Sequence, residues 1–280
     1  MRNSFLFLFL AATGPLTAQG PVPAPERDTP SPIEDNSFLV EEAYNQERGI
    51  VQHANTFSRS RGSAAWTYTF TQEWPVGGQR NQLSYTLPLA RNDDPAEETA
   101  GIGDIALNYR YQIGGGEGPR LAFAPRATLL LPTGSSRRGL GSGGTGFQIN
   151  LPLSAKLSPG FVAHSNAGLT YTPRARDTFG NVAAARSYTL GQSIIWLTHP
   201  KLNLMLESTW TASHDVSGAG QTQRSTEFLL SPGVRGAIDF ASGLQIVPGI
   251  AFPFDVGASR GERGVYFYLS FEHSFLGQSP

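Results

Sequence analysis

The amino-acid sequence predicts an all-β protein, a transmembrane antiparallel up-and-down β-barrel of about twelve strands. Three observations indicate this fold. The chain begins like an exported protein, yet it has no apolar run long enough for a spanning helix. Later stretches alternate between apolar and polar residues over about ten positions, the length of a tilted strand that crosses a bilayer. The connections alternate between short and long, as expected for short periplasmic turns and long outer loops.

Residues 1–18 have the pattern of a secretory signal peptide. Arg2 supplies a positive charge, an apolar run extends from Phe5 to Ala12, and small residues precede a cleavage site at Ala18. The run is far shorter than the roughly 20 residues of a spanning helix. We therefore expect export, and a closed barrel could still cross a membrane because it satisfies its backbone groups internally.

Residues 19–48 form a proline-rich, acidic segment with no strand period. Two interpretations remain open. The segment is either a disordered periplasmic tail or a plug. In the second case its acidic and aromatic part, around Glu41, Glu42, Tyr44 and Glu47, folds back into a polar pore.

The predicted barrel occupies residues 49–275, and residues 276–280 form a C-terminal tail. The first strand alternates poorly, and in each of the others one face is apolar or aromatic while the other carries hydroxyl, amide or charged groups. In chain order the strands are centred on residues 49–59, 65–75, 82–89, 104–111, 120–131, 147–157, 161–172, 187–197, 202–210, 227–235, 244–254 and 265–275. Between them we expect long outer loops that include residues 173–185 and 211–223.

Aromatic residues recur near the expected ends of the apolar band. Trp66 and Trp74 share one face of the second strand and are roughly 21 Å apart along the membrane normal, close to the spacing of the two aromatic girdles of outer-membrane barrels. The full set expected in the girdles is Trp66, Trp74, Tyr171, Tyr188, Trp196, Trp210 and Phe275.

The inward-facing positions carry charged and ionisable side chains that could not face lipid without a large free-energy cost. These candidates for the solute path are Arg110, Arg120, Arg126, Lys156, His164, Glu207, Glu227 and Arg235. They either pair across the lumen and rigidify it or act directly in solute passage. Because about twelve strands enclose less space than a porin, the sequence predicts a narrow, polar, partly plugged channel.

Other chemistry is not indicated. The chain has no cysteine, and its net charge of -1 offers no basic surface for nucleic acid. Its five histidines lack metal-ligand spacing, so we expect no metal site and no cofactor. A glycine pattern at residues 139–144 resembles a dinucleotide fingerprint but precedes a strand rather than a helix. His164 and Ser165 face opposite sides of a strand and cannot form a catalytic pair.

Four short motifs resemble the outer-membrane barrel family named for the meta-pathway of phenol degradation. They are Gly101-Ile102-Gly103-Asp104, Leu131-Pro132-Thr133-Gly134, Gly139-Leu140-Gly141-Ser142-Gly143 and Ser231-Pro232-Gly233. The resemblance covers most of the chain from about residue 37 and implies uptake of aromatic or hydrophobic compounds. Unlike many such barrels, the chain continues after its last aromatic strand residue, Phe275, to Pro280.

From these features we expect a channel or transporter for small solutes in the bacterial outer membrane, and not an enzyme. The expected partners are outer-membrane lipid, a small-molecule solute and the barrel-assembly machinery. Two alternatives remain: a non-conducting structural or surface-binding barrel, and, third, a barrel lipid hydrolase that uses His164 or His214.

Overall fold

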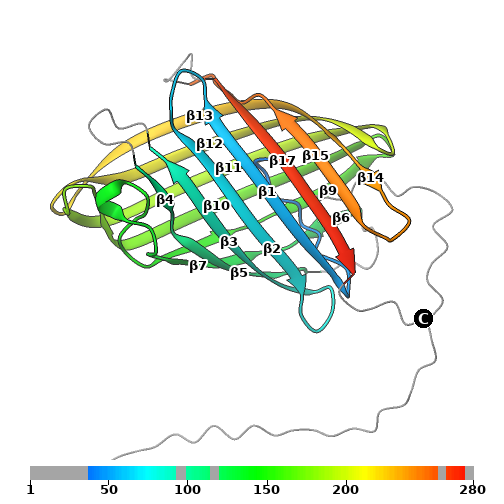
Figure 1. The fold of residues 1–280 in the computed structure, drawn as a ribbon, viewed down its shortest axis with the longest axis horizontal. Coiled ribbons are helices and arrows are strands. Elements are labelled where there is room, and N and C mark those ends of the chain that lie inside the picture. Colours follow the sequence, from blue (N-terminus) through cyan, green and yellow to red (C-terminus); the bar gives the residue numbers. More distant parts are fainter. Residues whose placement is uncertain (1–36, 93–98, 114–119, 258–262, 275–280) are drawn as a thin grey trace, which may run out of the picture. The chain divides into compact units, whose positions relative to one another are not determined.

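The computed structural model describes residues 37–92, 99–113, 120–257 and 263–274. Its 17 strand segments form a closed antiparallel barrel of 12 strands, because β1 (Ile50–Ser60) pairs with both β2 (Trp66–Pro75) and the last strand, β17 (Gly264–Ser274) (Figure 1). The predicted fold class and strand number are confirmed. The expected signal peptide and Phe275 lie outside the described residues. Within the described ranges, none of the helical structure is long and apolar enough to cross a membrane.

Several barrel strands consist of two segments, which explains why 17 segments make 12 strands. After β1 and β2, the third to sixth barrel strands are β3 (Asn81–Arg91), then β4 with β5 (Ala100–Ile102 and Ile105–Tyr111), β6 with β7 (Leu121–Phe123 and Arg126–Leu131), and β8 with β9 (Gly146–Asn150 and Leu153–Ser158). The others are β10 (Phe161–Arg176), β11 (Val182–His199), β12 (Leu202–Gly218), β13 and β14 (Gln221–Gly236 and Ile238–Asp239), and β15 and β16 (Gln245–Ala251 and Phe254–Asp255).

Proline accounts for three of the interruptions. Pro125, Pro152 and Pro253 lie at the breaks of their strands and have no N–H to donate to the neighbouring strand. Backbone hydrogen bonds still cross these breaks, because each proline carbonyl accepts from an amide of a neighbouring strand, as in the 3.1 Å bond from the Ala124 amide to the Pro152 carbonyl. The wall therefore stays closed while the strands bend.

Two segments expected to be outer loops are strand instead. Residues 173–185 lie largely within β10 and β11, joined by a short turn, and residues 211–223 lie largely within β12 and β13. These strands are 16 to 18 residues long. Above the bilayer both faces of a strand meet water, so a strand there need not alternate between apolar and polar residues. The strand ends were predicted from that alternation, which is why the outer parts of these two hairpins were expected to be loops.

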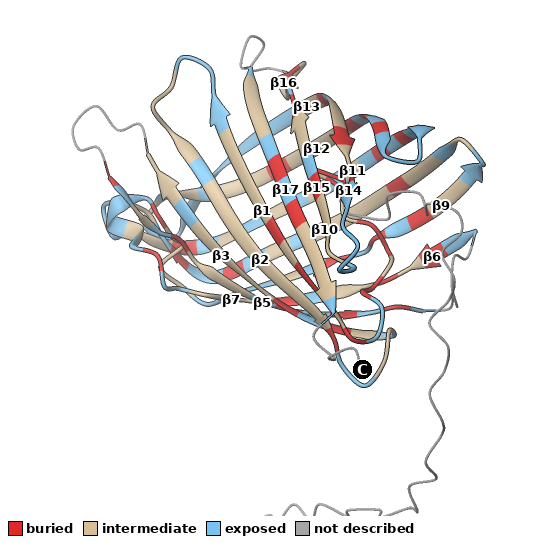
Figure 2. Ribbon diagram, turned by 45° about the vertical axis from the view of Figure 1, so that its right-hand side comes forward, coloured by how far each residue is buried: buried red, intermediate tan, exposed pale blue. Residues whose placement is uncertain are grey.

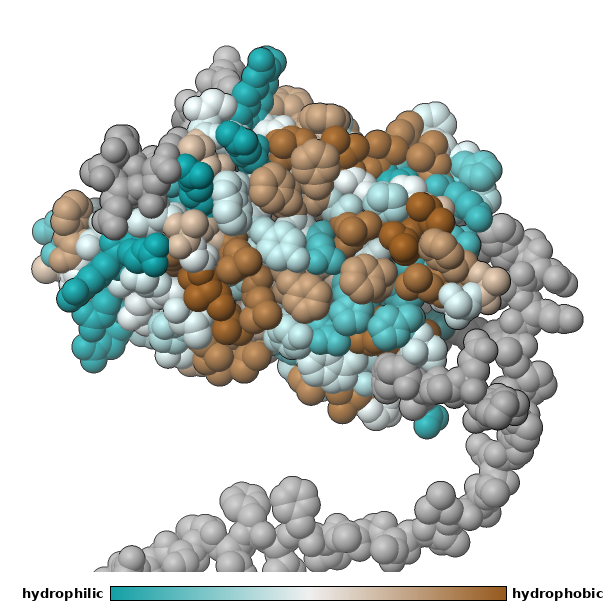
Figure 3. Space-filling model, viewed as in Figure 1, coloured by the Kyte–Doolittle hydropathy of each residue, from teal (hydrophilic) through white to brown (hydrophobic). Residues whose placement is uncertain are grey.

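The side chains divide between the two faces as predicted. Figure 2 shows exposed positions alternating with intermediate or buried ones along much of β11 and at the start of β12. The exposed positions carry large apolar residues such as Leu190, Trp196 and Leu206, each about half exposed. Figure 3 shows hydrophobic side chains gathered on the face formed by β1, β2, β3 and β17. This outer surface is suited to lipid.

The glycine-rich outer loop between β7 and β8, residues 132–145, is fastened to the barrel by Asp104. One carboxylate oxygen of Asp104 accepts from the Gly134 amide at 3.0 Å, and the other accepts from the amide and the hydroxyl of Ser142, both at 2.7 Å. Leu140 is buried over Gly101 and Gly103. Three of the four sequence motifs, at residues 101–104, 131–134 and 139–143, therefore contact one another at the outer end of the barrel.

Replacing Asp104 with alanine should free this loop. The change removes three hydrogen bonds to a carboxylate, each worth about 1.5 kcal/mol or more. We expect trypsin to cleave after Arg137 or Arg138, in the 3-10 turn η1 (Ser136–Arg138), about tenfold faster or more. Asp239→Ala, which removes a carboxylate from the opposite end of the barrel, is the matched control. Equal cleavage rates for Asp104→Ala and the unaltered protein would contradict the prediction.

Candidate functional site: the lumen and residues 37–47

Residues 37–47, here called the luminal segment, lie against the inward-facing side chains of the barrel wall. The segment has no regular secondary structure, so its backbone groups need partners elsewhere. Glu207 of β12 accepts from the amides of Leu39 and Val40 at 2.9 and 3.1 Å. Asn166 of β10 accepts from the Glu41 amide at 2.8 Å and donates to the Glu41 carbonyl at 2.8 Å. Side chains of the wall thus replace a neighbouring strand.

The same arrangement continues across the lumen to β3. The hydroxyl of Ser154 accepts from the Ala43 amide, at 2.7 Å. Further along, the side-chain oxygen of Gln112 accepts from the Asn45 amide and that of Gln82 from the Gln46 amide, both at 2.8 Å. These three acceptors are buried. The wall therefore binds the segment through its peptide groups over nearly its whole length.

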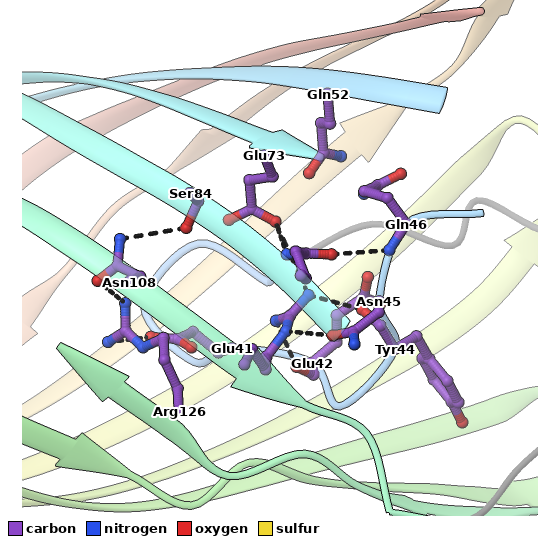
Figure 4. A network of polar contacts seen from close by, with 12 residues as sticks. Glu41, Glu42, Tyr44, Asn45, Gln46, Gln52, Glu73, Ser84, Asn108 and Arg126 are labelled. Carbon is purple, nitrogen blue, oxygen red and sulfur yellow. Dashed lines mark hydrogen bonds and ion pairs between the residues drawn. The ribbon is translucent and has the colours of Figure 1, made fainter. Parts of the chain in front are cut away.

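Arg110 is the main donor to the carbonyl side of the segment. Its guanidinium donates to the carbonyls of Glu42 and Tyr44 at 3.1 and 2.7 Å and to the side-chain oxygen of Asn45 at 2.7 Å. The Arg110 side chain is also 3.7 Å from the Glu73 carboxylate and is nearly fully buried. Figure 4 shows this network around Asn45. A planar group with fixed N–H directions suits several carbonyls at once.

Phe38 anchors the other end of the luminal segment. Its ring packs against the rings of Tyr266 and Tyr268, with centroids 5.8 and 5.5 Å apart, and the Tyr266 hydroxyl donates to the Phe38 carbonyl at 2.9 Å. The ring also lies over Gly233 and Gly249, where an added Cβ would lie 2.7 and 2.5 Å from ring carbons. Only glycine leaves room for Phe38 at these two positions of the wall.

Gly249→Ala should therefore expel Phe38 from its site. Because the chain has no cysteine, a buried Ser37→Cys change provides a single thiol that reports whether the segment has left the wall. We expect maleimide to label this thiol several-fold faster in the Gly249→Ala background. Gly168→Ala is the control, because a Cβ there meets nothing nearer than 3.5 Å. Unchanged labelling after Gly249→Ala would show that the ring is accommodated elsewhere.

His164, Glu207 and Arg235 form a buried group beneath the segment. All three are 2% exposed or less. Arg235 is close enough to interact electrostatically with both His164 and Glu207. The Ser154 hydroxyl lies 2.6 Å from Nδ1 of His164. These residues come from β9, β10, β12 and β13, with β11 between the two pairs, so the pairing and curvature of the sheet bring them together.

The other predicted lumen residues lie in different places. Arg126 is 2.7 Å from the Glu41 carboxylate of the luminal segment and donates to Gln148 and Asn108 (Figure 4). Lys156 lies 6.0 Å from the centre of the Tyr44 ring. Glu227 is exposed and lines an outer cavity of about 280 Å³ that also contacts Leu39. Arg120 is exposed at the start of β6, and the structure does not bring it to the others.

The described residues predicted for the aromatic girdles lie on the outer surface in two groups. Trp74 and Trp196 are near the periplasmic ends of β2 and β11, and the Trp196 ring stacks on Phe161 at 6.1 Å. Trp66, Tyr171 and Tyr188 lie toward the outer ends of β2, β10 and β11, and Trp210 lies at the middle of β12. Trp210 lies opposite Leu190 of the neighbouring strand, and Tyr188 lies opposite Leu169 and Ala212 of its two neighbours.

Sequence reasoning missed the uncharged side chains that hold the luminal segment. Gln82, Ser154 and Asn166 are at inward positions of the predicted strands and Gln112 directly follows one, so alternation put the first three on the polar face without indicating that they bind a segment of the chain. It also missed a small apolar cluster inside the barrel, which includes Phe38, Ile195, Met205 and Tyr268. Inward apolar residues carry no signal in a pattern that assigns apolar side chains to lipid.

Comparison with known proteins agrees with this structure. The sequence profile of the family described as "Putative MetA-pathway of phenol degradation" matches residues 36–271. No curated protein matches the chain. An outer membrane channel from Pseudomonas putida F1 has a similar structure, with 14% identity, a TM-score of 0.61 and coverage of 88% of this chain and 99% of that one. At this identity the similarity shows the outer-membrane barrel fold.

Two further solved structures are less similar. The NanC porin shares 10% identity at a TM-score of 0.49, with 79% of this chain and 98% of that one covered. The CymD monoaromatic hydrocarbon channel shares 8% identity at a TM-score of 0.44, with 84% of this chain and 90% of that one covered.

Proposed function

We propose that this chain, which belongs to the outer-membrane barrel family whose profile matches residues 36–271, is a channel for small solutes. The luminal segment is its plug. One observation carries the proposal. The polar side chains of the inner wall hydrogen-bond to peptide groups of a segment without secondary structure. When that segment leaves, the same donors and acceptors line a path in which water or a polar solute satisfies them.

The solute class that we propose is aromatic or otherwise hydrophobic compounds with a polar group. The family description supports this class, and the lumen supports it as well. Its wall combines buried polar side chains with the apolar cluster around Ile195 and Met205. Such a mixed surface suits molecules with one apolar and one polar end. We further propose that barrel-assembly machinery inserts the chain into the bacterial outer membrane, where lipid contacts its apolar outer face.

Planar-bilayer recording tests the channel function. Purified, refolded protein is expected to give discrete conductance steps, and a chain lacking residues 37–47 is expected to give larger ones. Heat-modifiable migration in electrophoresis verifies that both proteins are folded barrels. If neither form conducts, the protein is a non-conducting structural or surface-binding barrel.

A lipid hydrolase is the weaker candidate. The Ser154 hydroxyl and His164 are in contact, but Ser154 is fully buried and its oxygen accepts from the Ala43 amide. Ser165 and Ser213 instead donate to Gln192 and Ser187. No pair among these residues presents an accessible nucleophile next to a base. Lipid hydrolysis that disappears in both His164→Ala and His214→Ala would revive this candidate.

A further inference from the structure

A groove with a volume of about 760 Å³ lies on the outer surface of the barrel, where the outer ends of β1 and β17 are side by side (Figure 1). Arg59 of its lining lies opposite Trp66 of β2 and Val265 of β17, two positions beyond Phe57 on the same face of β1. The Phe57 ring packs against Trp66 and Phe267, with centroids 6.0 and 6.4 Å apart. The groove therefore begins where the apolar band of the outer surface ends, at the level of the lipid head groups.

Three exposed arginines line this groove. Arg59 and Arg61 come from the end of β1 and the turn that follows it, and Arg263 directly precedes β17. The Arg61 amide donates to the Arg263 carbonyl at 2.6 Å, so the backbone holds these two residues next to each other. Nε of Arg59 donates to the Ser63 carbonyl at 3.3 Å. Within the described ranges, the Arg61 and Arg263 side chains have no partner, and Arg59 has no second one.

The positive charge of this group is in excess among the described residues. The described lining of the groove includes no aspartate or glutamate. Glu227 lines the cavity of about 280 Å³ on the inner side of the wall together with Arg59 and Arg263, and it has an interaction of its own. Even with this one negative charge set against the three positive ones, two positive charges remain. The groove therefore favours a ligand that carries about two negative charges.

The rest of the lining is apolar and faces lipid. Phe252, Phe254 and Val265 contribute most of it, and Phe252 is 54% exposed. A free anion would leave this surface uncovered, whereas the acyl chain of a lipid would cover it. A phosphomonoester carries nearly two negative charges at pH 7, and guanidinium groups bind phosphate through paired N–H groups. A lipid with a phosphomonoester in its head group thus satisfies both parts of the groove.

We propose that this groove is a binding site for a phosphorylated glycolipid of the outer leaflet, of the kind represented by lipid A. Its phosphate lies among Arg59, Arg61 and Arg263, and one acyl chain lies along Phe252 and Val265. The site is on the lipid side of the wall, whereas the proposed solute path is on the inside. Binding of the lipid does not require conduction, so the two proposals can fail separately.

Native mass spectrometry of the full-length protein in detergent micelles tests the site with lipid A as the probe. Lipid A should bind at one high-affinity site per chain. The same lipid after enzymatic removal of its phosphates should bind at least about tenfold more weakly, because it loses the contacts with the charged donors. Phosphatidylglycerol, whose phosphodiester carries a single charge, should also bind more weakly. Inorganic phosphate should not displace lipid A, because it has no apolar part.

Three substitutions assign the binding to the arginines. Arg59→Gln, Arg61→Gln and Arg263→Gln keep a polar side chain but remove its positive charge. Each change alone should weaken lipid A binding several-fold, and the three together about a hundredfold or more. Phe252→Ala should weaken lipid A binding as well, because it removes part of the surface that the acyl chain covers.

The matched control replaces Arg137, Arg174 and Arg186 with glutamine. These arginines are also exposed and lie toward the outer end of the barrel, but they do not line the groove. The control removes the same total charge and should leave the affinity for lipid A unchanged.

Lipid A binding that is lost in the triple groove variant and kept in the control variant supports the site. Equal loss in the two triple variants would overturn it, because the binding would then depend only on the overall charge. Binding that survives the triple groove variant, or that dephosphorylated lipid A or phosphatidylglycerol matches, would also overturn it. Heat-modifiable migration first verifies that each variant is a folded barrel, and if the triple groove variant does not fold, the three single variants carry the test.

Discussion

Arg110→Met is expected to raise the single-channel conductance to that of a chain lacking residues 37–47. Arg110 donates three hydrogen bonds to the luminal segment. Each such bond from a charged donor contributes about 1.5 to 3 kcal/mol. A loss of about 3 kcal/mol or more shifts the equilibrium between bound and released segment by over a hundredfold. The measurement is planar-bilayer recording of the two proteins under identical salt.

The control for Arg110→Met is Arg120→Met. It removes the same type of side chain from an exposed position that does not contact the luminal segment, so its conductance should equal that of the unaltered protein. Glu73 keeps the hydrogen bond from Gln82 in the Arg110 variant, which limits damage to the wall itself. A folded Arg110→Met barrel with unaltered conductance would show that the segment is held without this side chain.

Arg126→Glu is expected to change ion selectivity and loosen the luminal segment together. Arg126 faces the lumen and forms an ion pair with Glu41 at 2.7 Å. Reversing its charge replaces this attraction with repulsion and leaves a negative lumen wall at that level. We expect reversal potentials in a salt gradient to shift toward cation selectivity, with larger conductance steps. High salt should reduce the selectivity change because it screens exposed charges.

A charge exchange separates the two effects of Arg126→Glu. The double variant Glu41→Arg with Arg126→Glu restores the ion pair in the opposite orientation, so the conductance should return to its original value. Additive effects of the two single changes would mean that the two side chains do not interact, and unaltered selectivity in Arg126→Glu would mean that this residue lies outside the ion path.

The sequence predicted the barrel because a strand between lipid and water must alternate. This constraint acts on each residue locally, so the pattern in residues 147–157 indicates a strand and its two faces without knowledge of any neighbour. The same rule placed Arg110, Arg126, His164 and Glu207 inside the barrel. It failed above the bilayer, in residues 173–185 and 211–223, because strands there have water on both sides and need not alternate.

The sequence by itself thus determined the strands, their number and which side chains face inward, since these follow from the period of a single strand and the solvent on each face. Residues 19–36 of the proline-rich segment lie outside the described residues, and only the tertiary structure places residues 37–47 against the inner wall. Their hydrogen-bond and ion-pair partners come from eight barrel strands and are separated from them by 34 to 228 positions in the chain. Such contacts depend on closure of the barrel, which no local pattern records.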